Sequence, residues 1–497
     1  MRKRSLWAGG TVLLVVALAA AITVAAYKWP ISGGVSAQDR ANELFAEEQQ
    51  ESAGVRAARN WNVPPEGEHV PHFGAPQEFA PVNYLKTKGW DGERPFGAGN
   101  DWEPDIAADP NSSYVYVITT RFGKDARACD DCPLPAFVYR VSNDNGATWG
   151  PEQYLCRCEG VDWQYDPQLV VSDDGTVYAT ILSSDWHTYL TKSSNHGQTW
   201  TTPVDVAPSQ KWTDHGGLTV SPDGQDVYVA FNQADSYVVA SHDGGATWGD
   251  PVRTNPTSAV AQYYYHYQGS VMPDGTVNIP ATSVNNENYA THLVRYYDLR
   301  STDGGATWQQ VWLDTFKEQP YCVKHRCRKD HLAGMIHLSA DGSTNLVAAY
   351  AGTRIAQHGQ MIYTSTSTDG GATWFGSKRV SPEFVGTRRV IASFPQIAGT
   401  GSCDFRLWWM DDRKNIDSWN TWFTRSTDCG ATWGAQVRIS DAASGAGYKH
   451  PAGYFADYGD YGGISIMSDG RTIATWGEAY SYWGPGGTWV NEELPHI

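Results

Sequence analysis

Acidic, histidine and aromatic side chains recur along this chain just before short apolar runs, where they could do chemistry together. These residues are Trp102, Trp163, Asp166, His215, Asp460 and Tyr461. An aromatic ring stacks on the C–H face of a sugar, and carboxylates accept hydrogen bonds from sugar hydroxyls. The combination favours a carbohydrate ligand. The alternative is that these side chains only hydrogen-bond to neighbouring strands.

Charged residues recur in a second place, just after the next apolar run. They are Arg121, Arg354, Arg413 and Glu478. A guanidinium group binds a carboxylate through two parallel hydrogen bonds, so a set of converging arginines would fit an acidic sugar.

Histidines offer a metal alternative. His215, His266 and His331 stand beside or near Asp214 and Asp330. Histidine and carboxylate suit Zn²⁺, but these residues are not at the short spacing of a local zinc motif. No cofactor and no metal ligand is therefore assigned from the sequence.

Two interleaved repeats must position these residues. The first has the pattern Ser-x-Asp/Asn-x-Gly-x-Thr-Trp, in which the carboxylate caps a turn and the glycine permits positive φ. Its six copies, whose starts lie 51, 48, 60, 66 and 59 residues apart, are Ser142–Trp149, Ser193–Trp200, Ser241–Trp248, Ser301–Trp308, Ser367–Trp374 and Ser426–Trp433. These residues are expected to be structural.

The second repeat is an apolar strand that ends in a turn, usually Asp-Gly. Its seven copies are Glu103–Pro110, Asp166–Gly175, His215–Gly224, Gln268–Gly275, Ala333–Gly342, Phe394–Gly399 and Tyr461–Gly470. Together the repeats give four antiparallel strands per unit, which is a blade of an all-β propeller. We expect seven blades, with six as the alternative, and a strand near Phe79–Tyr84 that completes the last blade and hides an open edge.

Alternation along such blades puts the first strand's turn and the Ser-x-Asp turn on one face. The chemically interesting residues then gather on the opposite face, where loops on a rigid scaffold carry function.

The Ser-x-Asp repeat resembles the Asp box, or bacterial neuraminidase repeat, of sialidases and related propellers, over about residues 76–497. The resemblance implies a glycoside hydrolase in which arginines clamp the sugar carboxylate and a tyrosine is the nucleophile. On this basis Tyr461 is the candidate nucleophile, Glu478 or Asp460 its base, and Asp166 the acid. Arg121, Arg354 and Arg413 are the candidate clamp, with Trp102, Trp163 and His215 also binding substrate.

A non-catalytic propeller that binds glycan or protein at the cell envelope is the alternative function. It is favoured by the absence of the family's Arg-Ile-Pro motif, since Glu103-Pro104-Asp105 stands in its place. A polysaccharide lyase with a histidine or tyrosine base is a third hypothesis. The formal net charge of −17 argues against nucleic acid as a partner.

The N-terminus predicts export. Arg2-Lys3-Arg4 precedes an uncharged run from Ser5 to Tyr27, long enough to span a bilayer. Residues 1–37 are therefore a signal anchor or a cleaved signal peptide, and either places the rest of the chain outside the cytoplasm. Residues 38–77 are a polar tether and 78–497 the propeller. Membrane contact is expected through the N-terminal segment only, and the oligomeric state stays open.

Eight cysteines in an exported chain predict disulfides. Cys403 and Cys429 belong to the same face of one blade and should pair, and Cys322 should pair with Cys327. Cross-pairing is expected within the remaining group, for which a four-thiolate zinc site is the alternative. That group is Cys129, Cys132, Cys156 and Cys158.

Overall fold

The computed structural model describes most of the chain after residue 85, and every regular element in that part is a strand. The described residues are 86–96, 100–122, 133–157, 160–233, 235–256, 263–284, 293–317, 334–354, 360–415, 418–441, 446–447, 462–479 and 486–495. They all belong to one unit, Val35–Ile497. In these ranges no helix is long and apolar enough to cross a membrane. The predictions for residues 1–37 and 38–77 lie outside the described residues.

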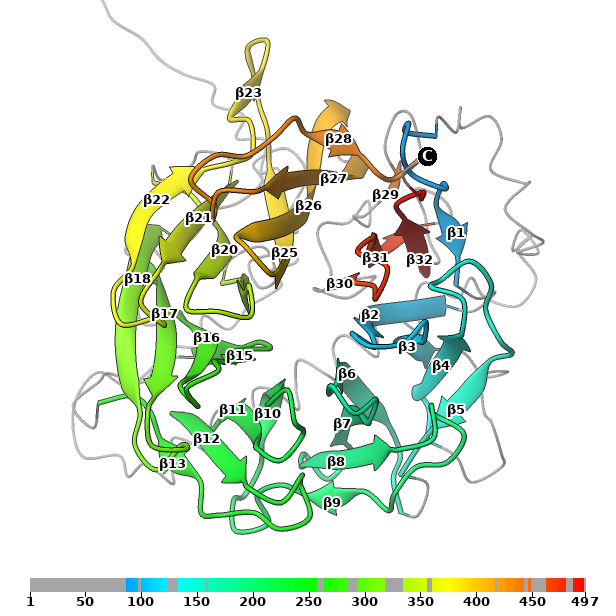
Figure 1. The fold of residues 1–497 in the computed structure, drawn as a ribbon, viewed down its shortest axis with the longest axis vertical. Coiled ribbons are helices and arrows are strands. Elements are labelled where there is room, and N and C mark those ends of the chain that lie inside the picture. The colour runs from blue at the N-terminus through cyan, green and yellow to red at the C-terminus, as the bar shows by residue number, and fades with distance from the viewer. Residues whose placement is uncertain are drawn as a thin grey trace, which may run out of the picture. The chain divides into compact units, whose positions relative to one another are not determined.

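Seven antiparallel sheets surround a common centre as the blades of a propeller (Figure 1). The strands of the first three blades, from inner to outer, are β2 (Asn100–Ala108), β3 (Val115–Phe122), β4 (Ala136–Ser142) and β5 (Gln153–Leu155); β6 (Gln164–Val171), β7 (Val177–Ser183), β8 (Thr188–Ser193) and β9 (Val204–Asp205); and β10 (Asp214–Val220), β11 (Val227–Asn232), β12 (Ser236–Ser241) and β13 (Val252–Arg253). The predicted seven-bladed ring is confirmed, and the six-bladed alternative is wrong.

The remaining blades follow the same plan, with small additions. Blades 4 to 6 comprise β14 (Tyr263–His266), β16 (Val277–Val284), β17 (Leu293–Ser301) and β18 (Gln309–Lys317), with β15 (Ser270–Val271) beside β16; β19 (Ile336–Ala340), β20 (Leu346–Gly352), β21 (Met361–Ser367) and β22 (Phe375–Arg379); and β25 (Ala392–Thr400), β26 (Asp404–Asn415), β27 (Ser418–Ser426) and β28 (Val437–Arg438), with β29 (Ala446–Gly447) beside β27. A separate hairpin, β23 (Phe384–Val385) and β24 (Arg388–Arg389), lies between blades 5 and 6 in the sequence.

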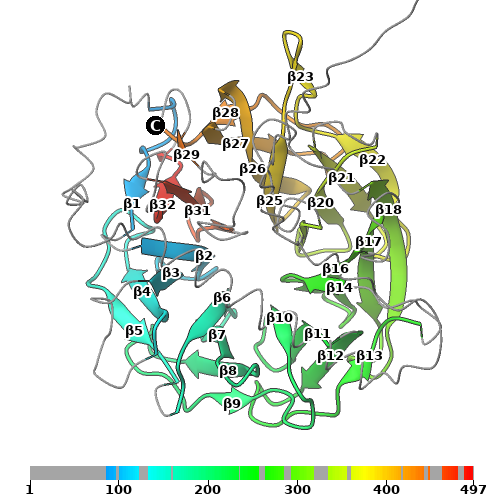
Figure 2. The same ribbon diagram turned by 180° about the vertical axis from the view of Figure 1, so that it is seen from behind.

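Both ends of the described chain build the last blade. Blade 7 runs from β30 (Gly463–Ile466) through β31 (Thr472–Ala479) and β32 (Gly486–Glu492) to β1 (Arg94–Pro95). Arg94 pairs with Val490 and Pro95 with Trp489. A strand from the N-terminal side therefore closes the ring, as predicted, and Figure 2 shows β1 beside β32 from behind. The residues differ from those predicted, because Phe79–Tyr84 lies outside the described residues.

Each Asp box is a turn held by its own side chains. In blade 4 the two oxygens of the Asp303 carboxylate accept the N–H of Thr307 at 2.9 Å and its hydroxyl at 2.6 Å. These bonds hold the pKa of the Asp303 carboxyl below its usual range. Gly305 takes a φ of 86°, which a residue with a side chain rarely adopts. The assignment of these boxes to structure agrees with this geometry.

Strand register sorts the loops onto two faces. In blade 1, Val115 pairs with Ala108 of β2 and with Ser142 of β4, so the first turn and the Asp box lie at the same end. Asp101 and Arg121 pair at the other end. We call the first end the box face and the second the loop face.

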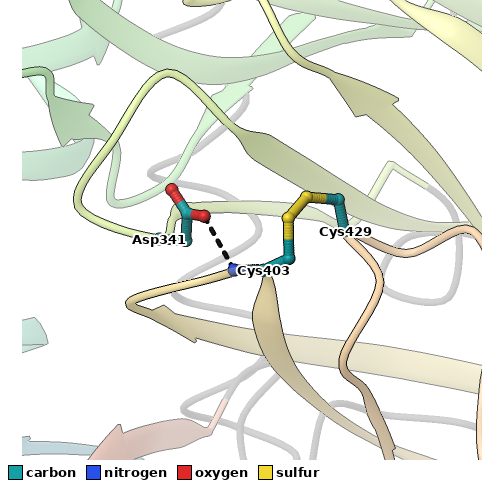
Figure 3. Close-up of side chains that lie close together, drawn as sticks. All are labelled: Asp341, Cys403 and Cys429. Carbon is teal, nitrogen blue, oxygen red and sulfur yellow. Dashed lines mark hydrogen bonds between the residues drawn. A yellow bond between two sulfur atoms is a disulfide. The ribbon is translucent and has the colours of Figure 1, made fainter.

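The disulfide Cys403–Cys429 links the first turn of blade 6 to the Asp box of that blade, as predicted. The Cα atoms lie 4.2 Å apart. Figure 3 shows Asp341 of the preceding blade accepting the N–H of Cys403, at 2.9 Å. Cys156 is also disulfide-bonded. Its partner, like the predicted pairings of Cys129, Cys132, Cys158, Cys322 and Cys327, lies outside the described residues.

Candidate ligand site

Four of the inner strands, which face the centre of the ring, have a β-bulge near their start. The register of β2, β6, β10 and β25 shifts between Trp102 and Asp105, Tyr165 and Gln168, Asp214 and Gly217, and Ser393 and Gln396, respectively. Within three of them a residue directly before proline takes positive φ: Glu103 at 54°, Asp166 at 58° and Phe394 at 58°. Such conformations cost energy and persist only where the surroundings enforce them.

The residue two positions after each of these strained residues lines an axial cavity of about 460 Å³. Pairing with the second strand puts one residue of each blade at the same level. The five polar members of this set, which we call the axial ring, are Asp105, Gln168, Gln268, His337 and Gln396. Glycine stands at this level in blades 3 and 7, as Gly217 and Gly463.

The cavity reaches the box face, because Pro110, Ser468 and Gly470, which belong to the turns after the first strands of blades 1 and 7, also line it. The sequence had placed the site on the loop face. None of the predicted residues Trp163, Asp166, Arg121, Arg354, Arg413 and Glu478 is in this lining.

The lining is built by hydrogen bonds between neighbouring blades. Asp105 Oδ2 accepts the N–H of Leu169 at 2.7 Å, and Gln168 Oε1 accepts that of Leu218 at 2.8 Å. Ser270, Ser339 and Ser465 accept backbone N–H groups of blades 5, 6 and 1 through their hydroxyl oxygens. Such bonds between neighbouring blades recur around the ring and fix the polar side chains at the cavity wall.

Some polar groups of the ring keep hydrogen-bonding capacity. Gln268 is exposed and its amide bonds to no described residue, and the Nε2 of Gln168 donates to none. Gln396 Nε2 contacts His337 Nε2 at 2.9 Å, and the Tyr267 ring lies 4.6 Å from the His337 ring. The cavity therefore offers amide donors and acceptors beside an imidazole and a phenol.

One acid lies in the lining. Burial raises the pKa of the Asp105 carboxyl to about 7, although the N–H groups of Leu169 and Ile106 oppose the rise. The described lining contains no arginine and no lysine. Asp105 is the one carboxyl group of the described lining, and it is about half protonated at pH 7.

Each arginine of the predicted clamp pairs with a carboxylate of the protein. Arg121 donates to Asp101 at 2.6 and 2.9 Å and to Glu152 at 2.6 Å. Arg354 pairs with Asp314 at 2.9 Å and Arg413 with Asp411 at 2.6 Å. The partner Asp101 lies on the strand beside that of Arg121. Asp314 lies on the outer strand of the preceding blade, and Asp411 lies on the same strand as Arg413.

Part of the predicted aromatic surface is buried. Trp163 is 6% exposed and its ring lies 5.2 Å from that of Trp186, in an edge-to-face contact. The side chains of Trp102 and His215, and all of Asp460 and Tyr461, lie outside the described residues. The role of Asp166 as acid stays a prediction.

Glu478 lies in a buried seam between blades 6 and 7. The Nε1–H of Trp476 donates to Glu478 at 3.0 Å, and burial together with the nearby Asp441 raises the pKa of Glu478 to about 8. Burial also raises the pKa of Glu93, whose two carboxylate oxygens have no hydrogen-bond partner among the described residues. The predicted contact of Glu478 with Tyr461 lies outside the described residues.

The histidine metal site is not formed by the residues described. His266 is buried and its Nε2 contacts the hydroxyl of Ser236 at 2.7 Å, while His331 and Asp330 lie outside the described ranges. Asp341, Cys403 and Cys429 have ligand atoms close together, but both sulfurs are in the disulfide.

Sequence reasoning missed the axial ring, although a signal was present. A polar residue follows proline in Glu103-Pro104-Asp105, Asp166-Pro167-Gln168 and Phe394-Pro395-Gln396. Its recurrence at one place in an otherwise apolar strand could have marked the ring.

No family model matches the sequence, and no curated protein matches it either. Solved structures do match. The microbial sialidase Hz136 is 15% identical with a TM-score of 0.40, and the match covers 79% of this chain and 65% of that one, slightly less than two thirds of its length. A family PL25 ulvan lyase is 12% identical, with a TM-score of 0.47 and coverage of 81% and 94%. The NanB sialidase of Streptococcus pneumoniae is 10% identical, with a TM-score of 0.41 and coverage of 83% and 70%.

Proposed function

We propose that this protein is a carbohydrate-binding propeller that holds an uncharged glycan in its axial cavity. The observation that carries the proposal is the lining itself: amide, hydroxyl, imidazole and phenol groups without a cation in the described part. A sugar hydroxyl both donates and accepts, and amide side chains such as those of Gln168 and Gln268 match both roles. The volume of about 460 Å³ is in the range of small-ligand sites.

The charge distribution is our reason for proposing an uncharged glycan rather than an acidic sugar. Recognition of a sialic acid carboxylate needs guanidinium groups that are available to it. Arg121, Arg354 and Arg413 each have a carboxylate partner from their own surroundings. An uncharged glycan needs no such group.

Glycoside hydrolysis is the second candidate, and Asp105 favours it. A general acid must be protonated at the working pH, and the Asp105 carboxyl, with a pKa raised to about 7, meets this requirement. Hydrolysis would then fall as pH rises above about 7, because the acid loses its proton. Binding ranks first because the described lining holds no second carboxylate to complete a catalytic pair.

A glycan array tests the binding proposal. The full chain should bind neutral oligosaccharides and show no preference for their sialylated forms. Selective binding to sialylated glycans would overturn the proposal. In parallel, aryl glycosides of neutral sugars and of sialic acid, assayed with and without chelator, test hydrolysis. Release of sugar that Asp105→Asn abolishes would promote the second candidate above the first.

A further inference from the structure

The β23–β24 hairpin is an insertion that belongs to no blade. Phe384 pairs with Arg389 and Val385 with Arg388, and the two strands pair with nothing else in the described residues. It lies in the connection from β22, the outer strand of blade 5, to β25, the inner strand of blade 6. Figures 1 and 2 both show the hairpin projecting beyond these blades at the edge of the ring.

The base of the hairpin is fixed to blade 6. Arg388 donates to the carbonyl oxygen of Asp412 at 2.6 Å and lies 3.3 Å from its carboxylate. The same carboxylate accepts the N–H of Ile391 at 2.9 Å, and Asp412 is buried. The N–H of Val390 donates to the carbonyl of Glu383 at 3.0 Å. The projection is therefore held by a polar anchor and presents its tip in a defined direction.

The tip is apolar and open to solvent. Phe384 is 44% exposed and Val385 45% exposed. Gly386 follows with a φ of 60°, which lets the chain turn tightly at this point. A turn that serves only to reverse the chain is normally polar, so two adjacent exposed apolar side chains at a hairpin end indicate a surface that is covered by something else.

Basic residues lie directly behind the tip. Residues 378–389 contain four basic side chains, Lys378, Arg379, Arg388 and Arg389, in a chain whose formal net charge is −17. Glu383 pairs with Arg379 and Arg389, and Asp412 pairs with Arg388, so four cations face two carboxylates and the segment keeps an excess of positive charge. Arg389 lies over the ring of Phe384, 5.0 Å from its centroid. A local positive charge on an acidic protein directs this segment toward an anionic surface.

We infer that the hairpin docks the propeller on an anionic lipid bilayer, with Phe384 and Val385 entering the headgroup region and the basic residues other than the anchoring Arg388 contacting lipid phosphates. An apolar tip backed by cations matches the layering of a bilayer surface, whose apolar interior lies beneath a charged headgroup zone. A soluble polyanion would satisfy the cations but would leave the apolar pair uncovered. The apolar run predicted at the N-terminus would keep a bilayer within reach, and the hairpin adds a second contact.

A fluorescent probe at the tip tests the docking of the hairpin in the full chain. Because the probe reports its own surroundings, contact of another part of the protein with the vesicle does not produce the signal. Val385→Cys carries an environment-sensitive fluorophore, and the control Val204→Cys carries it on the outer strand of blade 2, at a valine that is 37% exposed. Vesicles of phosphatidylcholine alone are compared with vesicles that also contain phosphatidylglycerol. We expect a blue shift and quenching by brominated lipid at position 385 only, and only with the anionic vesicles. An unchanged spectrum at 385, or equal shifts at 385 and 204, would overturn the inference.

Charge variants separate a bilayer from other partners. Arg379→Gln with Arg389→Gln should abolish the shift at 385, whereas Lys86→Gln with Lys88→Gln, which removes the same charge elsewhere, should preserve it. Raising the salt from about 0.1 M to about 1 M should weaken the shift, because the screening length falls from about 10 Å to about 3 Å. A shift caused by soluble dextran sulfate but not by anionic vesicles would assign the hairpin to a polyanion and overturn the bilayer inference.

Discussion

The loop-face arginine sites and the axial ring use similar polar side chains in opposite ways. On the loop face Arg121, Arg354 and Arg413 are each paired with a carboxylate. In the axial ring, the amide of Gln268 and the Nε2 of Gln168 have no partner among the described residues. Charges that are already paired stabilise the fold, and polar groups with spare hydrogen-bonding capacity are the ones that can recognise a ligand. The types of residue alone do not separate the two roles.

The largest expected effect comes from breaking a buried ion pair. Arg121→Ala leaves Asp101, which has no exposed surface, as an uncompensated buried charge. The free energy of unfolding should fall by about 3–5 kcal/mol, measured by urea denaturation. The folded fraction should bind glycan with unchanged affinity. Loss of binding at unchanged stability would return Arg121 to the ligand site.

The seam around Glu478 should make stability depend on pH. Glu478 faces Asp441 and Glu93, with Arg438, Lys86 and Asp91 as the other charged groups nearby. Because folding raises the pKa of Glu478 from 4.5 to about 8, the folded state binds the extra proton in that range. The contribution of Glu478 to the free energy of unfolding is fully present below about pH 4.5, and it is lost as the pH rises through about 8.

Glu478→Gln should flatten this decline in melting temperature between pH 5 and 8, a window set by the same linkage. Asp173→Asn, at an exposed carboxylate far from the seam in the sequence, is the control and should keep the wild-type slope. If Glu478→Gln kept the wild-type slope, the extra proton of the folded state would not be bound at Glu478.

The box face supplies a purely structural reference. Asp303→Ala removes the acceptor of the Thr307 N–H and hydroxyl and should lower the free energy of unfolding by about 1–3 kcal/mol. Glycan binding should persist, since Asp303 does not line the cavity. If binding fell while the melting temperature stayed the same, the division between box and site would be wrong.

The smallest effect is expected at the exposed arginine pair. The Arg354 side chain is 47% exposed, so its pair with Asp314 is screened by water. Arg354→Gln should cost about 0–1 kcal/mol of stability and leave glycan affinity unchanged. A large fall in affinity for any sialylated ligand would restore the clamp hypothesis for this residue.

The sequence predicted the fold well because its signal is local. Each Asp box closes a turn within eight residues, so six copies and seven first-strand repeats were enough to count blades. The pairing of Cys403 with Cys429 followed from the same assignment to a face.

The site was harder to predict because it depends on contacts between distant residues. The partners Asp314 and Arg354 are 40 residues apart, and neither segment contains a sequence pattern that predicts the ion pair. The axial ring is built from single residues in successive blades, at a level set by strand bulges such as the shift between Tyr165 and Gln168. The bulges depend on tertiary packing, which the repeat pattern does not encode.

The affinity of Gln268→Ala for a neutral oligosaccharide is the most direct test of the proposed function. Gln268 lines the cavity and bonds to no described residue, so its removal should not affect the fold. Calorimetry should show affinity about tenfold below wild type, equivalent to about 1.4 kcal/mol for a lost hydrogen bond. Gln198→Ala, which gives the blade 2 box the alanine found in the other five boxes, should bind like wild type. Equal affinity in Gln268→Ala and wild type would contradict the assignment of the axial cavity as the glycan site.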